Sequence, residues 1–329
     1  MPLPEVSVVL PFRNGARFLG ESMLSILRQT LHALELIAID DGSTDGARQL
    51  AERIAATDER VKVVSGRGSG LVDALNLGLD MARGPYVARM DADDIAEGPR
   101  LQCSFETLEA NLALVVLGTA AVLIDQDGVV GRTCRPPLRH GAILLAARSG
   151  IGPAMVHPSV MMRTRAVREV GGYRAHADVC EDLDLWLRLG AIGRLGNLRT
   201  PLLRLRKHTG NVTLTRWQDA MTSRIIVLAA ERLRRAGRLD PLECTTCDWR
   251  GYRECVRRLL IRRRLLPEAE RTDQVGRNAS WTRNGVQGPA SNERRTLGRV
   301  WNSARKIVQM ELAVSAVVKA GPCHSEERL

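Results

Sequence analysis

Three aspartates within four positions, Asp91, Asp93 and Asp94, form the part of this sequence best suited to chemistry. They directly follow residues 86–90, which have the pattern of a buried strand, and Ala92 lies between the first two. Because the chain bends where a strand becomes a loop, carboxylates two positions apart can face one point, and their hard oxygens suit Mg²⁺ or Mn²⁺. The alternative is an acidic surface turn that caps the helix starting near Pro99.

A second acidic cluster, residues 40–45, follows another predicted strand and reads Asp-Asp-Gly-Ser-Thr-Asp. A carboxylate such as Asp40 or Asp41 at a strand end can accept a hydrogen bond from a nucleotide base or from a ribose hydroxyl. The alternative is a helix cap supplied by Ser43 or Asp45. A cap explains one acidic residue but not three, so the cluster indicates a binding site.

A third acidic pair, Glu181 and Asp182, comes just before the amphipathic run of residues 183–188. The helix dipole favours carboxylates in a first helical turn, which is a fair explanation of the pair by itself. The functional interpretation makes Asp182 a general base that removes a proton from an acceptor hydroxyl.

The elements that must position these side chains alternate between strand and helix patterns over the first 95 residues. Continuous apolar runs predict strands, and apolar residues at helical spacing predict helices. The predicted strands are residues 6–10 (ended by Pro11), 34–39, 61–64 and 86–90, and the predicted helices are residues 16–29, 47–55 and 71–82. Such alternation predicts a parallel sheet with helices on both faces, and ligands bind such sheets at the carboxyl ends of the strands.

The pattern becomes mixed after about residue 100. Further strands are predicted at residues 114–124, 159–163 and 202–206, with a turn at Asp127-Gly128 and a short helix at residues 182–189. The whole pattern predicts an α/β fold with a mostly parallel, Rossmann-like central sheet flanked by helices.

Six segments, in order, resemble glycosyltransferase family 2, whose members are inverting enzymes with the GT-A fold. They are residues 6–11, 40–45, 78–94, 157–161, 171–174 and 181–186. The likeness extends over about residues 6–208. It implies a GT-A nucleotide-sugar-binding domain, a nucleotide-sugar donor and a divalent metal, Mn²⁺ or Mg²⁺.

The resemblance also implies a role for each matching residue. Asp182 would be the catalytic base, with Glu181 beside it. Asp93 would be the direct metal ligand together with Asp91, and His208 would complete the metal site as in some members; a solvated loop histidine is the alternative for His208. His157 would support the loop on the acceptor side. The implied nucleotide-sugar-binding residues are Pro11, Arg13, Asp40, Asp41, Ser43, Asp91 and Ala92.

Two departures from the family pattern bear on function. Processive members carry Gln-x-x-Arg-Trp, whereas Thr213 stands where that Gln would be, ahead of Arg216-Trp217, so transfer of a single sugar is expected. The loop at residues 67–71 replaces an asparagine-rich version. Its glycines do not have the spacing of a dinucleotide-binding loop.

The 329 residues are predicted to form three parts. Residues 1–214 would be the GT-A catalytic domain, residues 215–266 a basic helical extension, and residues 267–329 a flexible linker with a short terminal helix. In the extension, residues 252–264 combine an apolar helical face with many arginines. Such a helix can lie on anionic lipid, or it can pack on the catalytic domain with a solvated arginine face.

Composition adds broader expectations. The formal charge of +11 suits an anionic donor and an anionic membrane surface, although a compositional bias towards arginine would give the same charge. No apolar run approaches the length of a membrane span and no signal peptide is visible, so the expected location is cytoplasmic, with the inner face of the cell membrane as a peripheral site. Aromatic residues make up only 3%, so no nucleic-acid partner is expected.

The seven cysteines do not suggest a disulfide framework in such a chain. Cys244, Cys247 and Cys255 could hold zinc, but no fourth ligand stands at a typical spacing; unpaired thiols are the alternative.

Together these observations predict an inverting glycosyltransferase. It would move one sugar from a UDP-, dTDP- or GDP-linked donor to a hydroxyl of a glycan or lipid-linked acceptor, in the assembly of cell-surface polysaccharide, lipopolysaccharide or glycolipid. A sugar nucleotidyltransferase is the competing enzyme class, although residues 11–17 lack its glycine-rich basic signature. A catalytically inactive, membrane-associated scaffold is the non-enzyme alternative, and the presence of Asp91, Asp93 and Asp182 argues against it.

Overall fold

The computed structural model describes residues 3–150, 152–208, 216–243 and 248–262, together with residues 281–282 and 285–286. Spatial contacts divide the chain into two compact units. The first comprises Met1–Ala147, Gly152–Tyr173 and Leu185–Lys207, and the second comprises Arg148–Ile151, Arg174–Asp184 and His208–Leu329.

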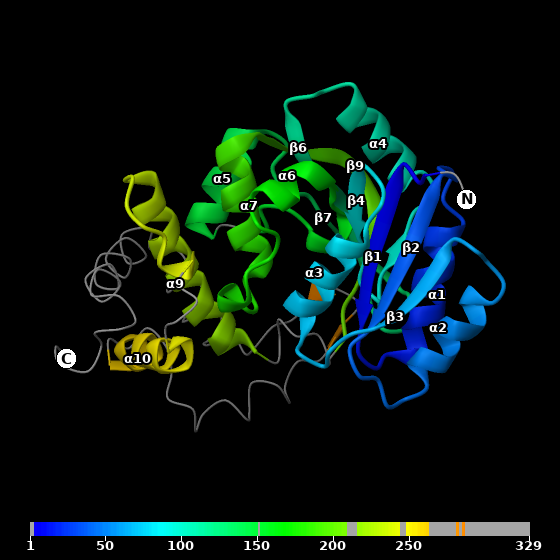
Figure 1. The fold of residues 1–329 in the computed structure, drawn as a ribbon, viewed down its shortest axis with the longest axis horizontal. Helices are drawn as coiled ribbons and strands as arrows, with labels where there is room; N and C mark the ends of the chain where they lie inside the picture. Colours follow the sequence, from blue (N-terminus) through cyan, green and yellow to red (C-terminus); the bar gives the residue numbers. More distant parts are fainter. Residues whose placement is uncertain are drawn as a thin grey trace. The chain divides into compact units, whose positions relative to one another are not determined.

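The N-terminal half of the first unit is a parallel sheet with helices on both faces (Figure 1). Its strands stand in the order β3-β2-β1-β4, where β1 is Val6–Phe12, β2 Leu34–Asp40, β3 Val61–Ser65 and β4 Tyr86–Arg89. Helices α1 (Ala16–Leu27) and α2 (Ala47–Ala55) cover one face, and α3 (Leu71–Met81) covers the other. From β1 the chain adds β2 and β3 on one side and then returns to add β4 on the other side of β1. Right-handed crossovers therefore place α3 on the face opposite to α1 and α2.

The side chains of β1 alternate between these two faces. Val8 and Leu10 belong to the core cluster that also contains Leu19 of α1. Val9 points to the opposite face, where a Cβ on Gly78 of α3 would lie 2.4 Å from the Val9 Cγ1. Because every residue of β1 and β2 is buried, both strands are mostly apolar in sequence.

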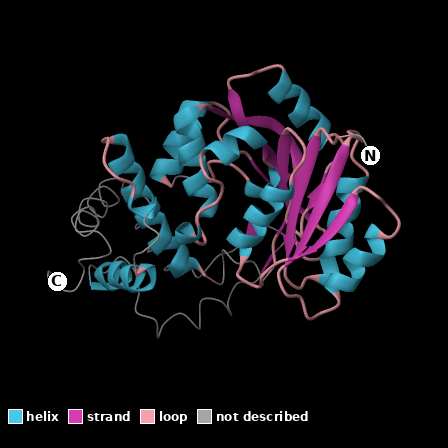
Figure 2. Ribbon diagram, viewed as in Figure 1, coloured by secondary structure: helices cyan, strands magenta, loops and turns pink. Residues whose placement is uncertain are grey.

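The C-terminal half of the sheet is mixed (Figure 2). Strand β8 (Met161–Arg163) pairs antiparallel with both β4 and β6 (Leu114–Ile124), and β6 runs parallel to β9 (Arg194–Arg206). Two short antiparallel strands, β5 (Ile95–Ala96) and β7 (Val130–Cys134), pair with β9 and β6. The other helices of this part are α4 (Arg100–Glu109), η1 (His157–Ser159), α6 (Thr164–Glu169), α5 (His140–Ser149) up to Ala147, and α7 (Glu181–Ile192) from Leu185 onward.

Three predicted strand boundaries differ from the structure by two residues or more. Strand β1 continues through Pro11 to Phe12. Proline is tolerated there because its missing N–H faces β4, and the pairing of β4 with β1 has already ended at Val9. Residues 157–159 form a 3₁₀ helix, so β8 is shorter than predicted. Strand β9 begins at Arg194 rather than near residue 202, because its pairing with β6 continues through register shifts.

The second unit contains η2 (Ala175–Ala177), α9 (Trp217–Arg235), η3 (Pro241–Glu243) and α10 (Trp249–Arg262). An ion-pair network holds it together: Arg174 binds Asp184 and Asp240, and Arg234 also binds Asp240 at 2.8 Å. The ring of His176 stacks on Trp249 with centroids 4.5 Å apart. Segment 174–184 is therefore packed against residues that follow position 215 in the same unit.

Several sequence predictions concern residues outside the described parts. Cys244 and Cys247 lie there, as do Thr213 and the terminal helix predicted for residues 300–318; Cys255 lies half-buried in α10. Beyond Arg262 the described residues form only a short antiparallel pair, β10 (Trp281–Thr282) with β11 (Gly285–Val286). Across the described parts of the chain, no helix is both long and apolar enough to cross a membrane.

Candidate active site

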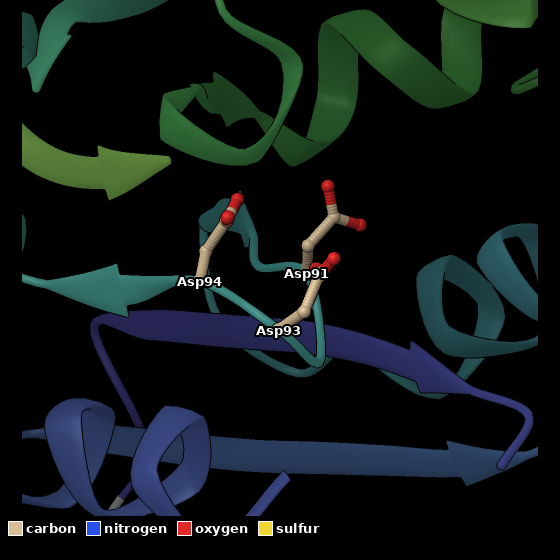
Figure 3. Close-up of side chains that lie close together, drawn as sticks. All are labelled: Asp91, Asp93 and Asp94. Atoms are coloured by element: carbon tan, nitrogen blue, oxygen red, sulfur yellow. The ribbon is translucent and has the colours of Figure 1, made fainter. Parts of the chain in front are cut away.

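The acidic cluster, defined as Asp91, Asp93 and Asp94, lies in the turn that follows β4 (Figure 3). One ligand oxygen from each carboxylate lies within 4.8 Å of the others. Strand β4 borders β1 on the side opposite β2, so the cluster lies at the point where the strand order reverses. Open α/β sheets bind ligands at this point. The structure thus brings Asp91 and Asp93 together and adds Asp94 to them.

The environments of the three carboxylates differ. Asp91 and Asp93 are half-buried, whereas Asp94 is 1% exposed. Burial, together with the neighbouring Asp91 and Asp93, raises the pKa of Asp94 well above its usual value. Burial also raises the pKa of Asp91, although an ion pair with Arg89 opposes this effect. Like charges held this close favour a cation between them.

Two buried arginines interact with the cluster. Arg89 is the last residue of β4, is 4% exposed and pairs with Asp91. Arg100 of α4 is 1% exposed and donates to the backbone carbonyl of Arg89 at 3.1 Å. Burial lowers the pKa of Arg100 to about 10, which leaves it charged at neutral pH. Neither arginine was predicted as part of the site, although Arg89 stands out in the sequence as an arginine within an apolar strand.

The acidic cluster fits a divalent cation. The Oδ2 atom of Asp94 is buried and has no hydrogen-bond partner within the described part of the chain. Its Oδ1 atom accepts from the backbone N–H of Arg206 at 2.8 Å, which fixes the carboxylate. Hydrogen bonding of the Ser22 hydroxyl to the Asp91 carbonyl at 2.7 Å anchors the loop to α1. Three convergent carboxylates with an unsatisfied buried oxygen are hard ligands of the kind that Mg²⁺ and Mn²⁺ prefer.

The second acidic cluster lies at the carboxyl end of β2. Asp40 accepts from the backbone N–H of Ser43 at 2.9 Å, and its other oxygen lies 3.5 Å from Arg48. Asp41 accepts from the backbone N–H of Gly70 at 2.9 Å through Oδ2. Its Oδ1 is buried without a hydrogen-bond partner in the described residues. A hydrogen-bond donor on a bound ligand could satisfy that oxygen.

Hydrogen bonds join the loops after β1 and β2. The Ser43 hydroxyl accepts from the N–H of Asn14 at 2.8 Å, and the Asn14 side chain accepts from the N–H of Thr44 at 2.8 Å. Asp45 accepts from the first N–H groups of both α1 (Ala16, 2.9 Å) and α2 (Ala47, 3.0 Å). Asp45 therefore acts as a helix cap, as the alternative interpretation expected for one residue of this cluster.

The remaining residues predicted to bind the nucleotide sugar lie at the same edge of the sheet. Pro11 is buried near the end of β1, and Arg13 is exposed just beyond it. Ala92 is half-buried between Asp91 and Asp93. Strands β1, β2 and β4 are parallel, so their carboxyl ends present all of these residues together.

The predicted catalytic pair opens helix α7. Glu181 is buried and Asp182 is half-buried, and the Oδ1 of Asp182 accepts from the N–H of Leu183 at 2.6 Å. Both residues belong to the second unit, as does half-buried His208. Their roles, and their placement towards the acidic cluster, remain predictions.

His157 lies in η1 in the first unit. Its Nε2 lies 3.0 Å from the hydroxyl of Tyr173, and its ring packs edge-on against Trp186 with centroids 5.7 Å apart. Burial, reinforced by the positive charge of Arg89, holds the pKa of His157 well below its usual value. The imidazole is therefore neutral at physiological pH. These contacts are compatible with the predicted supporting role.

Comparison with known proteins shows the family. The model of "Glycosyl transferase family 2" matches residues 7–171. A Bacillus subtilis (strain 168) protein named "Putative glycosyltransferase EpsE" is 34% identical over 234 residues, which cover 70% of this chain and 82% of that protein. The chain belongs to glycosyltransferase family 2 and is a transferase enzyme.

Solved structures share the fold. TarS of S. aureus in complex with UDP-GlcNAc aligns with a TM-score of 0.57 and 18% identity over 70% of this chain, and the match spans 66% of the TarS chain. The mannosyltransferase PcManGT from Pyrobaculum calidifontis, in complex with GDP-Man and Mn²⁺, aligns with a TM-score of 0.53 and 19% identity over 96% of this chain and 86% of that chain. The predicted α/β GT-A fold is thus confirmed.

Proposed function

We propose that this enzyme transfers a single sugar, with inversion, from a nucleoside-diphosphate sugar to an acceptor hydroxyl in a reaction that depends on a divalent metal. The observation that carries this proposal is the acidic cluster at the switch point of the sheet, with its buried and unsatisfied Asp94 oxygen. A structure of the same fold binds GDP-Man and Mn²⁺, and another binds UDP-GlcNAc, which supports a nucleotide-sugar donor.

The nucleoside part of the donor would bind at the ends of β1 and β2. Asp40 and Asp41, buried at 5% and 4% exposure, would accept hydrogen bonds from the base or ribose beside Pro11. Exposed Arg13 would meet the anionic part of the donor, and Ser43 would act mainly by holding the loop that carries Arg13. The donor's phosphates would then extend towards β4.

The diphosphate would lie at the acidic cluster. Asp93 and Asp91 would hold the metal, Mn²⁺ or Mg²⁺, with His208 as a further ligand; Asp94 would fix the loop and complete the negative site. Ala92 would line the donor pocket between the two ligands. When bound, the metal neutralises charge that develops on the leaving diphosphate.

Asp182 would take the proton from the acceptor hydroxyl while that oxygen attacks the anomeric carbon from the face opposite the diphosphate. One displacement of this kind inverts the anomeric configuration. Glu181, more deeply buried, would orient the first turn of α7. Carboxylates at the start of a helix are stabilised in the ionised form that a base requires.

The acceptor would be a glycan or a lipid-linked sugar in cell-surface polysaccharide, lipopolysaccharide or glycolipid assembly. Exposed arginines at the end of α9 and on α10, such as Arg235, Arg238 and Arg250, could meet anionic lipid at the inner face of the membrane from the cytoplasm. The three-part organisation, with boundaries after residues 214 and 266, belongs to the same proposal. Nothing favours a nucleotidyltransferase, because the chain belongs to a glycosyltransferase family.

A donor panel tests the proposal. Purified protein would be incubated with Mn²⁺ and each of several UDP-, GDP- and dTDP-sugars, and free nucleotide would be measured. We expect nucleotide release with one donor class, and an inverted product by NMR once an acceptor is found. Absence of both binding and release with every donor would contradict the proposal.

A further inference from the structure

Arg206, the last residue of β9, is a buried cation that contacts the loop of the acidic cluster. Its side chain is only 3% exposed, although it carries a guanidinium group. A charge buried this deeply is costly unless it is paired and fully hydrogen-bonded. Its contacts therefore indicate what the residue is for.

Two of these contacts are hydrogen bonds to residues of the acidic cluster. The backbone N–H of Arg206 donates to Oδ1 of Asp94 at 2.8 Å, and the side-chain Nε donates to the backbone carbonyl of Asp93 at 2.8 Å. The backbone at position 206 thus holds the Asp94 carboxylate, and the guanidinium sets the backbone position of the neighbouring Asp93. Neither bond occupies an oxygen of the Asp93 side chain.

The other end of the guanidinium is anchored to separate elements. Nη2 binds Glu21 of α1 at 2.6 Å, and the group lies 4.6 Å from the ring centroid of Phe18. Nη1 lies 3.2 Å from the carbonyl oxygen of Asp125 and 3.3 Å from that of Gln126, in the turn between β6 and β7. Arg206 therefore connects the cluster to α1 and to the β6–β7 turn.

A guanidinium suits this position because its donors form a rigid planar fork. A lysine ammonium could keep the charge, but a single nitrogen cannot reach the Asp93 carbonyl, Glu21 and the turn carbonyls together. Charge alone therefore does not explain the residue. Its fixed shape would hold the loop in one conformation.

We propose that Arg206 is a positioning residue: it fixes Asp93 and Asp94 in the geometry that binds the divalent cation. This inference rests on the proposed function, because it presumes that the acidic cluster holds a metal. Arg206 would touch neither the donor nor the acceptor; it would act through the loop that it holds.

The test measures Mn²⁺ affinity rather than turnover. Free Mn²⁺ would be followed by electron paramagnetic resonance in the presence of UDP, GDP or dTDP, whichever the wild type binds. We expect Arg206→Lys to weaken Mn²⁺ binding at least ten-fold while its circular dichroism remains that of the wild type. The matched control is Arg204→Lys on the same strand, where a 46% exposed arginine pairs with Glu97 at 2.7 Å; its affinity should not change.

Glu21→Gln provides a second, milder variant, since the Glu21 side chain is 56% exposed and tolerates loss of its charge. It should weaken Mn²⁺ binding about three-fold, and it decides the question if Arg206→Lys does not fold. Unchanged affinity in a folded Arg206→Lys, or in Glu21→Gln when that variant decides alone, overturns the inference. If the wild type binds no Mn²⁺, or if Asp93→Asn binds it equally well, the proposed metal site itself fails and the inference fails with it.

Discussion

At the scale of single residues, the three carboxylates after β4 lie close together but differ in burial. Asp94 is 1% exposed and has a strongly raised pKa, whereas Asp91 pairs with Arg89. The sequence predicted the pair Asp91 and Asp93 from their spacing. It could not predict Arg206 as a partner of the loop, because a contact between residues 94 and 206 depends on the register of β9 against β6 and β5.

Asp182→Asn tests the proposed base. Asparagine keeps the shape and the acceptor oxygen that binds the N–H of Leu183, but it cannot take a proton. We expect kcat to fall by about 10²- to 10⁴-fold, with the donor Kd unchanged, as measured by steady-state kinetics and calorimetry. The control is Asp80→Asn, an exposed position in the last turn of α3 that should leave kcat unchanged. Full turnover in Asp182→Asn would remove this residue from the mechanism.

His157 predicts a pH dependence of stability. Its folded-state pKa is well below the usual value, chiefly because of burial, whereas the unfolded chain titrates near about 6.5. As pH falls through that value, the unfolded state takes up a proton that the folded state excludes, so the free energy of unfolding decreases. His157→Gln lacks this contribution.

Urea denaturation at several pH values between about 7 and 5 would measure the effect. The free energy of unfolding should decrease less steeply with falling pH in His157→Gln than in the wild type. Parallel slopes for the two proteins would show that His157 does not titrate as its burial requires.

At the scale of elements, the β-α alternation of the first 95 residues could be predicted from the sequence because β1, β2 and β4 are uninterrupted buried runs. Helix α2 has the predicted bounds, and α1 and α3 differ from the prediction by at most two residues. The mixed half of the sheet was harder to predict. The short β5, β7 and the register shifts of β9 depend on long-range pairing, which local periodicity does not encode.

The contacts of Asp45 predict that this one side chain stabilises both α1 and α2. Both helices begin after a glycine without a side-chain cap of its own, and Asp45 accepts from the first N–H of each. Asp45→Ala should lower the free energy of unfolding by about 1–2 kcal/mol. Because these backbone donors lower the pKa of Asp45, the difference should shrink as pH falls through that pKa.

Chemical denaturation checks this prediction against Asp127→Ala, which removes an exposed carboxylate that pairs with exposed Arg17. That control should change stability by less than about 0.5 kcal/mol. If both variants lost the same small amount, capping by Asp45 would not explain how the two loops are held.

The close approach of α3 to the sheet at Gly78 leaves no space for a side chain there. A Cβ there would lie 2.4 Å from Val9 Cγ1 and 2.8 Å from Ile39 Cδ1. Gly78→Ala should therefore destabilise the protein by about 1–3 kcal/mol, measured as a shift in the denaturation midpoint. Gly141→Ala in α5 meets no atom within 4 Å and should be neutral or stabilising by up to about 1 kcal/mol. Equal effects at the two sites would contradict the packing argument.

At the scale of the whole molecule, the compact units do not follow the order of the sequence. Segment 174–184, which contains Glu181 and Asp182, clusters with the residues that begin at His208. Arg174 pairs with Asp184 from this segment and with Asp240 from beyond α9. The basic extension, predicted from its composition as a separate helical part, therefore supplies ion-pair partners for the segment that carries the proposed base.

The family resemblance, taken from six segments, was confirmed for the fold and the enzyme class. Those segments are informative because they combine buried strands with polar residues at the strand ends, and both features are local in sequence. Donor identity depends on the shape of the pocket, so composition and spacing could not supply it.

Binding of nucleoside diphosphates with and without metal tests the proposed metal-dependent donor site. Isothermal titration of UDP, GDP and dTDP into the wild type and into Asp93→Asn, each with Mn²⁺ or with EDTA, would measure it. We expect one nucleotide to bind the wild type at least ten-fold more tightly with Mn²⁺ than with EDTA, and we expect Asp93→Asn to lose this difference. Equal affinity with and without Mn²⁺, or a full metal effect in Asp93→Asn, would contradict the proposed site.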